Sequence, residues 1–166
     1  MKYLWNKVIH FFIFGSLYLN IEIIVRAYNK SLVGWNGIIK YSFAGWTSLW
    51  MFPIAGFLAC IIGNLNNNKK IINLKLYQQV IISGIIVTIC EFILGIILNI
   101  ICKFNIWNYS NDKFNILGQI CLQNTIYWFL LSIFVIWLDD VITYHIYDIN
   151  KPDSLFIYIK KLITLK

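Results

Sequence analysis

The stretch that decides the fold is VIISGIIVTICEFILGIILNIIC, residues 80–102, in which Glu91 is the only charged residue. About 20 consecutive apolar residues allow an α-helix to cross the hydrocarbon core of a bilayer. A helix that is apolar on all sides must be buried in a large core or in lipid. In a chain of 166 residues the stretch therefore predicts a transmembrane helix.

Three further apolar runs, residues 8–25, 48–63 and 117–138, complete the predicted set of spans. The run at 48–63 is short and contains Pro53, a break that neighbouring helices can accommodate in a membrane. The chain is thus expected to be an all-α polytopic membrane protein with about four transmembrane helices in a compact bundle over residues 1–150.

The first run follows Lys2 and Lys7, a pattern that also occurs in signal peptides. Asn20 and Glu22 stand where a small-residue cleavage site would fall. The run is therefore interpreted as a retained helix.

The composition agrees with lipid as the solvent, because hydrophobic residues make up 60% and charged residues 13% of the chain. Typical soluble domains have roughly half and a quarter. The net charge is +7, but the basic residues lie in the gaps between apolar runs and form no patch of the kind that binds nucleic acid. Abundant Asn, Ile and Lys with little Arg is typical of an AT-rich bacterial genome.

With four spans, most of the lysines fall on the side that holds both termini and the loop at residues 64–75. Cytoplasmic loops carry an excess of Lys and Arg. The expected location is the cell membrane, with both termini in the cytoplasm.

Two segments outside the runs are expected to lie at the membrane surface. Residues 27–47 contain the aromatic residues that favour the headgroup region, and a re-entrant hairpin is the alternative. Residues 151–166 form a short amphipathic, basic tail, interpreted as an interfacial helix on anionic lipid, with a frayed end as the alternative. The aromatic residues of the first segment are Trp35, Tyr41, Phe43 and Trp46.

Glu91 is the most informative residue, because a charge at the centre of a bilayer costs at least about 2.5 kcal/mol. Gly95 and Asn99 follow at helical spacing, so the three share one face that should point into protein. We expect Glu91 either to be protonated or to have a cationic partner. Arg26 is the candidate partner, and Glu22 lies one helical turn before it, which makes Glu22, Arg26 and Glu91 a predicted intramembrane network.

This network has two interpretations. Intramembrane ionisable groups commonly mark a path for protons or solutes. They can equally fix the register of packed helices without any transport. The sequence leaves both open.

The segment IWNYSNDKFNILGQI, residues 106–120, is rich in short polar side chains that favour turns. One interpretation is an ordered turn that caps the helices, and the other is the wall or lid of a polar pocket. The residues singled out are Trp107, Asn108, Tyr109, Ser110, Asn115, Gly118 and Gln119.

No motif for catalysis or for a metal or other cofactor is found. The chain lacks a GxxxxGK[ST] phosphate loop, a GxSxG elbow and an HExxH helix. Its four cysteines form no CxxC pair, so they are interpreted as packing residues. Asp139, Asp140 and His145 are interpreted as a solvated helix end rather than as a metal site. No enzyme activity is expected.

Three blocks in order, TSLWMFPIAG at 47–56, EFILGIILN at 91–99 and WNYSNDKFNILGQICL at 107–122, resemble the CmpB-like ABC-transporter type IV family. The resemblance covers about half of the chain and implies a four-helix membrane domain, but it names no solute. Asn108 stands where the family pattern has Asp, Lys113 where it has Pro and Ala55 where it has Tyr. A proton or cation carried by that Asp in relatives could not be carried by Asn108.

We therefore expect a permease-like or accessory membrane component for a small solute or ion. Four helices would need a homo-oligomer or a separate membrane partner to enclose a path, and any ATPase would be a separate chain. The alternative is a structural or regulatory membrane protein without transport.

Overall fold

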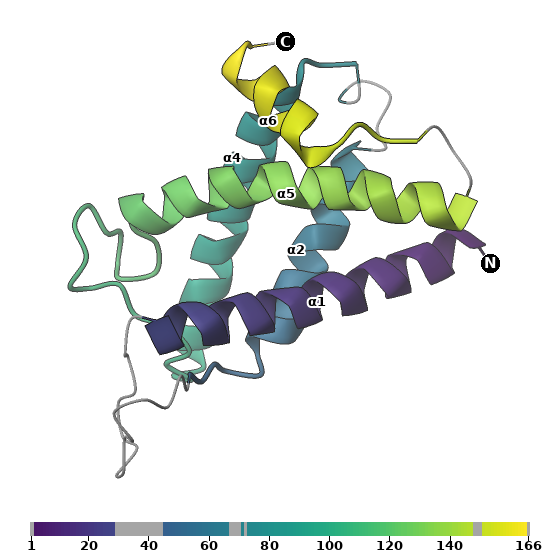
Figure 1. The fold of residues 1–166 in the computed structure, drawn as a ribbon. Helices are drawn as coiled ribbons and strands as arrows, with labels where there is room; N and C mark the ends of the chain where they lie inside the picture. Colours follow the sequence, from purple (N-terminus) through teal and green to yellow (C-terminus); the bar gives the residue numbers. More distant parts are fainter. Residues whose placement is uncertain (1, 29–44, 67–70, 72, 148–150, 166) are drawn as a thin grey trace. The chain divides into compact units, whose positions relative to one another are not determined.

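A computed structural model describes residues 2–28, 45–66, 71, 73–147 and 151–165 of the chain (Figure 1). These residues form α-helices, one π-helical segment and irregular connections, with one isolated β-bridge between Ile116 and Ile120. The elements are α1 (Lys2–Tyr28), α2 (Met51–Asn66), α4 (Leu76–Gly95), η1 (Ile96–Ile101), α5 (Leu122–Tyr147) and α6 (Leu155–Ile163).

Among the described residues, three helical stretches are long and apolar enough to cross a membrane: Lys7–Tyr28, Leu76–Ile101 and Leu122–Ile146. A shorter apolar helix covers Met51–Leu65. Pro53 lies in the first turn of α2, where its missing N–H removes no intrahelical hydrogen bond. The protein is therefore an all-α polytopic membrane protein.

The chain divides into two compact units, Met1–Ala59 and Cys60–Lys166, and the boundary falls within α2. In the N-terminal unit, α1 and the start of α2 pack through two reciprocal contacts of glycine with phenylalanine. A Cβ added at Gly15 would lie 2.8 Å from the Phe52 carbonyl oxygen, and one at Gly56 would lie 2.7 Å from that of Phe11. Small residues at these positions let the helices approach closely, as is common in membranes.

In the C-terminal unit, α4 packs against α5, and α6 packs against both (Figure 1). A Cβ added at Gly84 of α4 would lie 2.6 Å from the ring of Phe129 of α5. The opposite face of α4 and η1 carries isoleucines at every fourth position, which are 43–52% exposed and suit contact with lipid. They are Ile81, Ile85, Ile89, Ile93 and Ile97.

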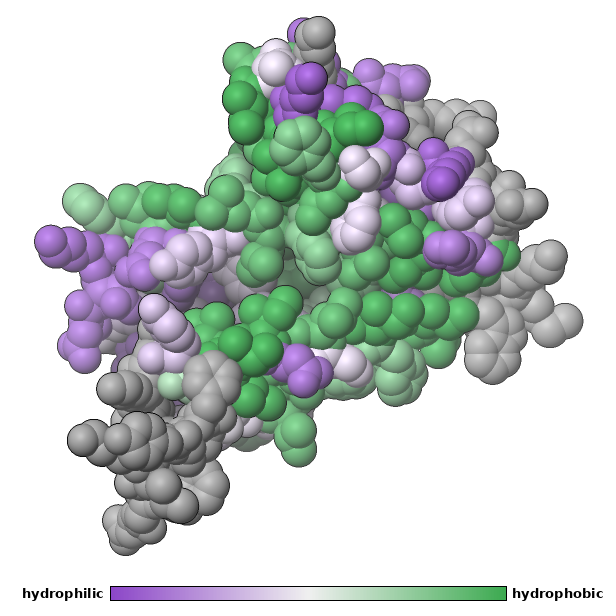
Figure 2. Space-filling model, viewed as in Figure 1, coloured by the Kyte–Doolittle hydropathy of each residue, from purple (hydrophilic) through white to green (hydrophobic). Residues whose placement is uncertain are grey.

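The hydropathy of the surface follows this arrangement. Figure 2 shows hydrophobic side chains along α5, and hydrophilic side chains gathered over the loop that precedes it. Such a band with a polar end is the surface expected of a helix that spans a bilayer.

The structure corrects several expected boundaries. The fourth helix begins at Leu122 and not at residue 117, because Leu117 (φ +52°) and Gly118 (φ +66°) have left-handed backbone conformations that a helix excludes. It also continues past residue 138 to Tyr147. Residues 64–66, expected in a polar loop, belong to α2.

Of the two surface segments, the tail forms α6 (Leu155–Ile163), with Ser154 at its N-cap position. Trp35, Tyr41 and Phe43 of the expected interfacial segment lie outside the described residues.

Candidate functional site

The buried face of the α4–η1 helix carries both small and polar residues. Gly84, Val87, Glu91 and Gly95 of α4 and Asn99 of η1 are all buried, and Glu91 is only 5% exposed. Their spacing of three or four residues places them on one side of the helix. A carboxyl group and a carboxamide therefore point toward protein and not toward lipid.

The Glu91 carboxylate connects three parts of the C-terminal unit. The Tyr109 hydroxyl, from the loop before α5, donates a 3.2 Å hydrogen bond to Oε1. The Trp128 indole Nε1, from α5, donates a 2.7 Å hydrogen bond to Oε2. Both donors are neutral, and within the described part of the chain Glu91 forms no ion pair. The carboxylate thus holds the loop and α5 against α4.

These two donors differ in what they allow chemically. An indole N–H can only donate a hydrogen bond, whereas a phenol hydroxyl can donate or accept one. A proton on Oε2 would face the Trp128 N–H and break that hydrogen bond. A proton on Oε1 can be accommodated if the Tyr109 hydroxyl turns to accept it. Loading and release of a proton at Glu91 would therefore reverse the hydrogen bond to the loop and leave the one to α5 intact.

About two helical turns further along, Asn99 binds both ends of the same loop. Its Nδ2 donates a 2.9 Å hydrogen bond to Gln119 Oε1, and its Oδ1 accepts a 2.7 Å hydrogen bond from the Ile106 backbone N–H. Gly95 makes room for this contact, because a Cβ there would lie 2.7 Å from Gln119 Oε1. Gln119 is 6% exposed, so this carboxamide pair is buried.

Asn99 lies in a π-helical segment. The η1 hydrogen bond from the Cys102 N–H to the Ile97 carbonyl, at 2.9 Å, spans five residues and not the four of an α-helix. Short π-helical segments are rare and often occur at functional sites.

Residues 107–119 form a compact loop held by its own polar groups. Asn108 Oδ1 accepts hydrogen bonds from the Ser110 N–H (2.9 Å) and hydroxyl (2.6 Å). Asn115 Nδ2 donates to the Asp112 carbonyl at 2.8 Å, and Asn115 Oδ1 accepts from the Gly118 N–H at 3.1 Å. The loop is therefore an ordered structure with a defined shape.

The ends of this loop meet. The Tyr109 N–H donates to the Gly118 carbonyl at 2.8 Å, and Trp107 Nε1 donates to the Gln119 carbonyl at 3.0 Å. Phe114 and Leu117 have positive φ angles of 54° and 52°, a conformation that costs a bulky residue about 1 kcal/mol or more. The network of polar contacts offsets that strain.

A second polar cluster lies in the N-terminal unit. Arg26 forms a 2.6 Å ion pair with Glu22 one turn earlier, and the Thr47 hydroxyl donates a 2.6 Å hydrogen bond to the other Glu22 oxygen. The Arg26 guanidinium lies 4.7 Å from the centre of the Trp46 ring. The structure thus places Glu22 and Arg26 together in one unit and Glu91 with Tyr109 and Trp128 in the other. A single network of Glu22, Arg26 and Glu91 stays a prediction.

Reasoning from the sequence missed one residue of interest and misinterpreted another. Trp128 lies within an apolar run and was not singled out there, although a buried indole N–H generally needs an acceptor. Asp139 was expected at a solvated helix end, which is wrong, because α5 continues to Tyr147 and Asp139 is 2% exposed. Gly63 of α2 faces it, and a Cβ there would lie 3.1 Å from Asp139 Cγ.

Comparison with known proteins identifies a family that matches this chain. The family described as "Putative ABC-transporter type IV" matches residues 9–165, nearly the whole chain. The chain belongs to this family. Both polar clusters lie within the matched residues. No curated protein and no solved structure gave a match, and the family description names no solute.

Proposed function

We propose that the protein is the membrane component of a transport system for a small solute or ion, either as a permease or as its accessory subunit. Glu91 is the proton- or cation-responsive group, and the loop at residues 107–119 is the gate. The observation that carries the proposal is the buried Glu91 carboxylate, which has one donor on the loop and one on α5. A change of charge at Glu91 would alter the hydrogen bond with Tyr109 that attaches the loop to α4.

Each part of the cluster has a role in this proposal. Trp128 keeps Glu91 attached to α5 in both protonation states, because its bond to Oε2 does not need to change. The hydrogen bond between Oε1 and the Tyr109 hydroxyl changes when Oε1 gains or loses a proton, and this change reaches the loop. Asn99 holds both ends of the loop, through Gln119 and through the Ile106 N–H, so that movement is confined to the residues between them.

In the N-terminal unit, the ion pair of Glu22 and Arg26 is the charge-balancing element. A charge in a membrane segment needs such a partner. In the proposed arrangement the protein resides in the cell membrane with both termini in the cytoplasm. It carries out no catalysis of its own, and it encloses a path together with further copies or a membrane partner. An ATPase, if one drives the system, is a separate chain.

The variant Glu91→Gln tests the proposal, because glutamine can keep both hydrogen bonds. Its carbonyl oxygen can accept from Trp128 while its amide donates to the Tyr109 hydroxyl. Only ionisation is lost. The matched control is Asp153→Asn, which removes an exposed carboxylate on the segment before α6.

Host cells that lack the gene would be complemented with wild type, Glu91→Gln or Asp153→Asn. Their content of ions would be measured by elemental analysis, and their content of small solutes by mass spectrometry. Wild type and Asp153→Asn should change the level of the same solute or ion. Glu91→Gln should match the empty vector at equal abundance in the membrane. A Glu91→Gln variant with wild-type effect would contradict the assigned role of Glu91.

A structural or regulatory role without transport is the second candidate. The observation in its favour is that both Glu91 oxygens are already bonded by neutral donors within one unit, as a fixed tie between helices requires. On this hypothesis wild type changes no solute level in the complementation experiment. Glu91→Ala then destabilises the fold, and Glu91→Gln does not.

A further inference from the structure

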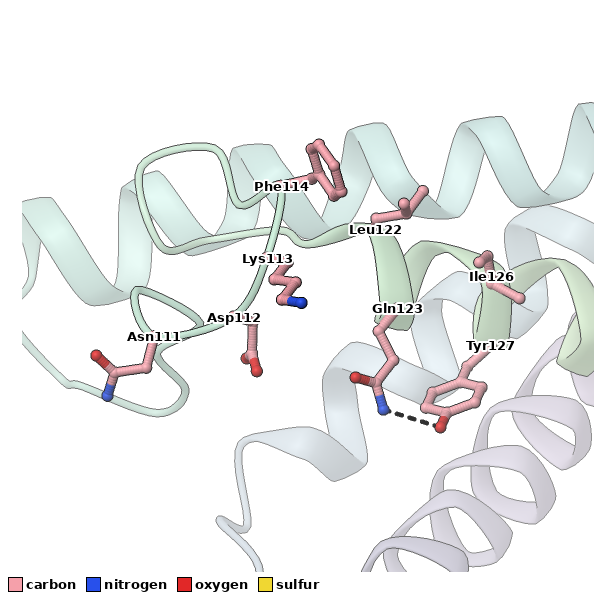
Figure 3. A pocket seen from close by; sticks show the side chains of 8 residues that line it. All are labelled: Asn111, Asp112, Lys113, Phe114, Leu122, Gln123, Ile126 and Tyr127. Atoms are coloured by element: carbon pink, nitrogen blue, oxygen red, sulfur yellow. Dashed lines mark hydrogen bonds between the residues drawn. The ribbon is translucent and has the colours of Figure 1, made fainter.

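A pocket opens where the loop at residues 107–119 meets the start of α5. Its volume is about 520 Å³, and it is lined by residues 111–114 of the loop and by the first turns of α5 (Figure 3). All of its lining residues belong to the C-terminal unit. The pocket shares no residue with the cluster of Glu91, Tyr109 and Trp128, so a ligand bound there does not depend on the proposed transport function.

One part of the pocket is polar and carries two opposite charges. Lys113 and Asp112 are neighbours in the loop, and both are exposed. In the described part of the chain neither the Lys113 ammonium nor the Asp112 carboxylate forms an ion pair. On α5, Gln123 Nε2 donates a 3.0 Å hydrogen bond to the Tyr127 hydroxyl, and both side chains also line the pocket (Figure 3).

The other part of the pocket is apolar. Phe114, Leu122 and Ile126 are 79%, 48% and 50% exposed, and all three line it. Large apolar groups exposed on a membrane protein are in contact with lipid acyl chains or the inner edge of the headgroups. Phe114 keeps a left-handed backbone conformation (φ +54°), which is costly for an aromatic residue.

The position of the pocket along the membrane normal follows from α5. Leu122 is the first residue of a candidate membrane span that ends at Ile146. The pocket therefore lies at the end of a span, where the headgroups of one leaflet begin. The loop also carries Trp107 and Tyr109, residue types that are enriched at this level.

We propose that this pocket binds a phospholipid whose headgroup carries both a phosphate and a primary amine. Lys113 binds the phosphate, and Asp112 accepts hydrogen bonds from the ammonium group. The first carbons of an acyl chain pack on Phe114, Leu122 and Ile126. A purely anionic headgroup would pair with Lys113 but would be repelled by Asp112. A quaternary amine would lack the N–H groups that Asp112 accepts.

Native mass spectrometry of the purified full chain in mild detergent tests whether the protein prefers such a lipid. The added lipids are phosphatidylethanolamine, phosphatidylcholine and phosphatidylglycerol with the same acyl chains. Wild type should retain phosphatidylethanolamine best. Free phosphoethanolamine is the fourth probe, and it should bind far more weakly because it lacks the acyl chains.

Two variants should change the binding of phosphatidylglycerol in opposite directions. Lys113→Gln should weaken the binding of phosphatidylethanolamine and of phosphatidylglycerol equally, by about tenfold, because one charge-assisted hydrogen bond is lost. Asp112→Asn should weaken the binding of phosphatidylethanolamine and strengthen that of phosphatidylglycerol, so that phosphatidylglycerol becomes the preferred lipid. Lys103→Gln, an exposed lysine outside the pocket, should bind as wild type does.

Three results would overturn the proposal. The first is equal retention of the three lipids by wild type, and the second is unchanged binding in both pocket variants. The third is free phosphoethanolamine bound as tightly as the lipid, which would indicate a soluble ligand instead. Because both pocket substitutions are at exposed residues of the loop, the variants should keep the wild-type melting temperature, which is measured alongside.

Discussion

Trp128 Nε1 donates a 2.7 Å hydrogen bond to Glu91 Oε2, and it thereby connects two helices through residues 37 positions apart in the sequence. The acceptor is a carboxylate with 5% exposure on a helix that spans the membrane. A buried polar atom that loses its partner costs about 1–3 kcal/mol. This bond is therefore where substitutions should be most informative about the C-terminal unit.

Trp128→Phe should lower the free energy of unfolding by about 1–3 kcal/mol, because Oε2 keeps no donor. The measurement is thermal or denaturant unfolding of the purified protein in detergent. Trp137→Phe is the matched control: its indole donates to the Asp153 carbonyl at 3.2 Å on an exposed part of the surface, where water can replace it. Equal effects of the two substitutions would mean that the bond to Glu91 contributes no special stability.

The double variant Trp128→Phe with Glu91→Ala should be less destabilised than the sum of the two single variants. The two residues share one contact, and substitutions that share a contact are not additive. Unfolding of all four proteins under one condition gives the coupling. Simple additivity would argue that Glu91 and Trp128 act independently.

Gly95→Ala should destabilise the protein by about 1–3 kcal/mol through overpacking. The added methyl group would lie 2.7 Å from Gln119 Oε1 and 2.8 Å from Gln119 Cβ. It would push Gln119 away and break its hydrogen bond with Asn99. Amide hydrogen exchange of residues 106–120 should rise, and Ile93→Ala on the exposed face of α4 should leave it unchanged. Unchanged exchange in Gly95→Ala would show that the loop does not depend on this contact.

Gly118→Ala should loosen the contact between the two ends of the loop. Gly118 has φ +66°, and a Cβ would lie against the Ser110 hydroxyl and 2.9 Å from Asn108 Oδ1. The Asn108–Ser110 contacts must then break. Trp107, whose indole binds the Gln119 carbonyl, should show a changed fluorescence spectrum or greater quenching by a soluble quencher. A wild-type spectrum would contradict the prediction.

The attachment of α6 should weaken at high pH. Burial of Tyr158, together with its 2.6 Å hydrogen bond to Asp140 and the negative charges of Asp140 and Asp153, raises the pKa of its hydroxyl. The unfolded chain therefore loses this proton first as the pH rises. The stability from the Tyr158 contact is fully present below the pKa of an unfolded tyrosine, about 10, and is lost as the pH rises toward the folded pKa.

Tyr158→Phe removes this dependence. Proteolysis of α6 followed from neutral pH to about pH 11 should accelerate in wild type. In the variant it should be faster at neutral pH and should vary less over the alkaline range. A wild-type rate that stays constant up to pH 11 would contradict the assignment.

Local features of this protein could be predicted from the sequence because they depend on local geometry. The apolar length of residues 80–102 requires a membrane helix. The helical repeat places Glu91, Gly95 and Asn99 on one face without knowledge of any other segment. The end of α5 could not be predicted in this way, because Asp139 and Asp140 look like a helix terminus until the packing around them is known.

What only the tertiary structure decided is which groups meet. Tyr109 and Trp128 lie 18 and 37 residues from Glu91, and the sequence contains no periodicity that brings them together. The same holds for Gly63 opposite Asp139, and for the α5 residues that line the pocket with Lys113. In a helix, backbone hydrogen bonding and apolar length are properties of one segment. A buried polar group takes its partner from whichever segment packs against it, and this packing is a property of the folded chain.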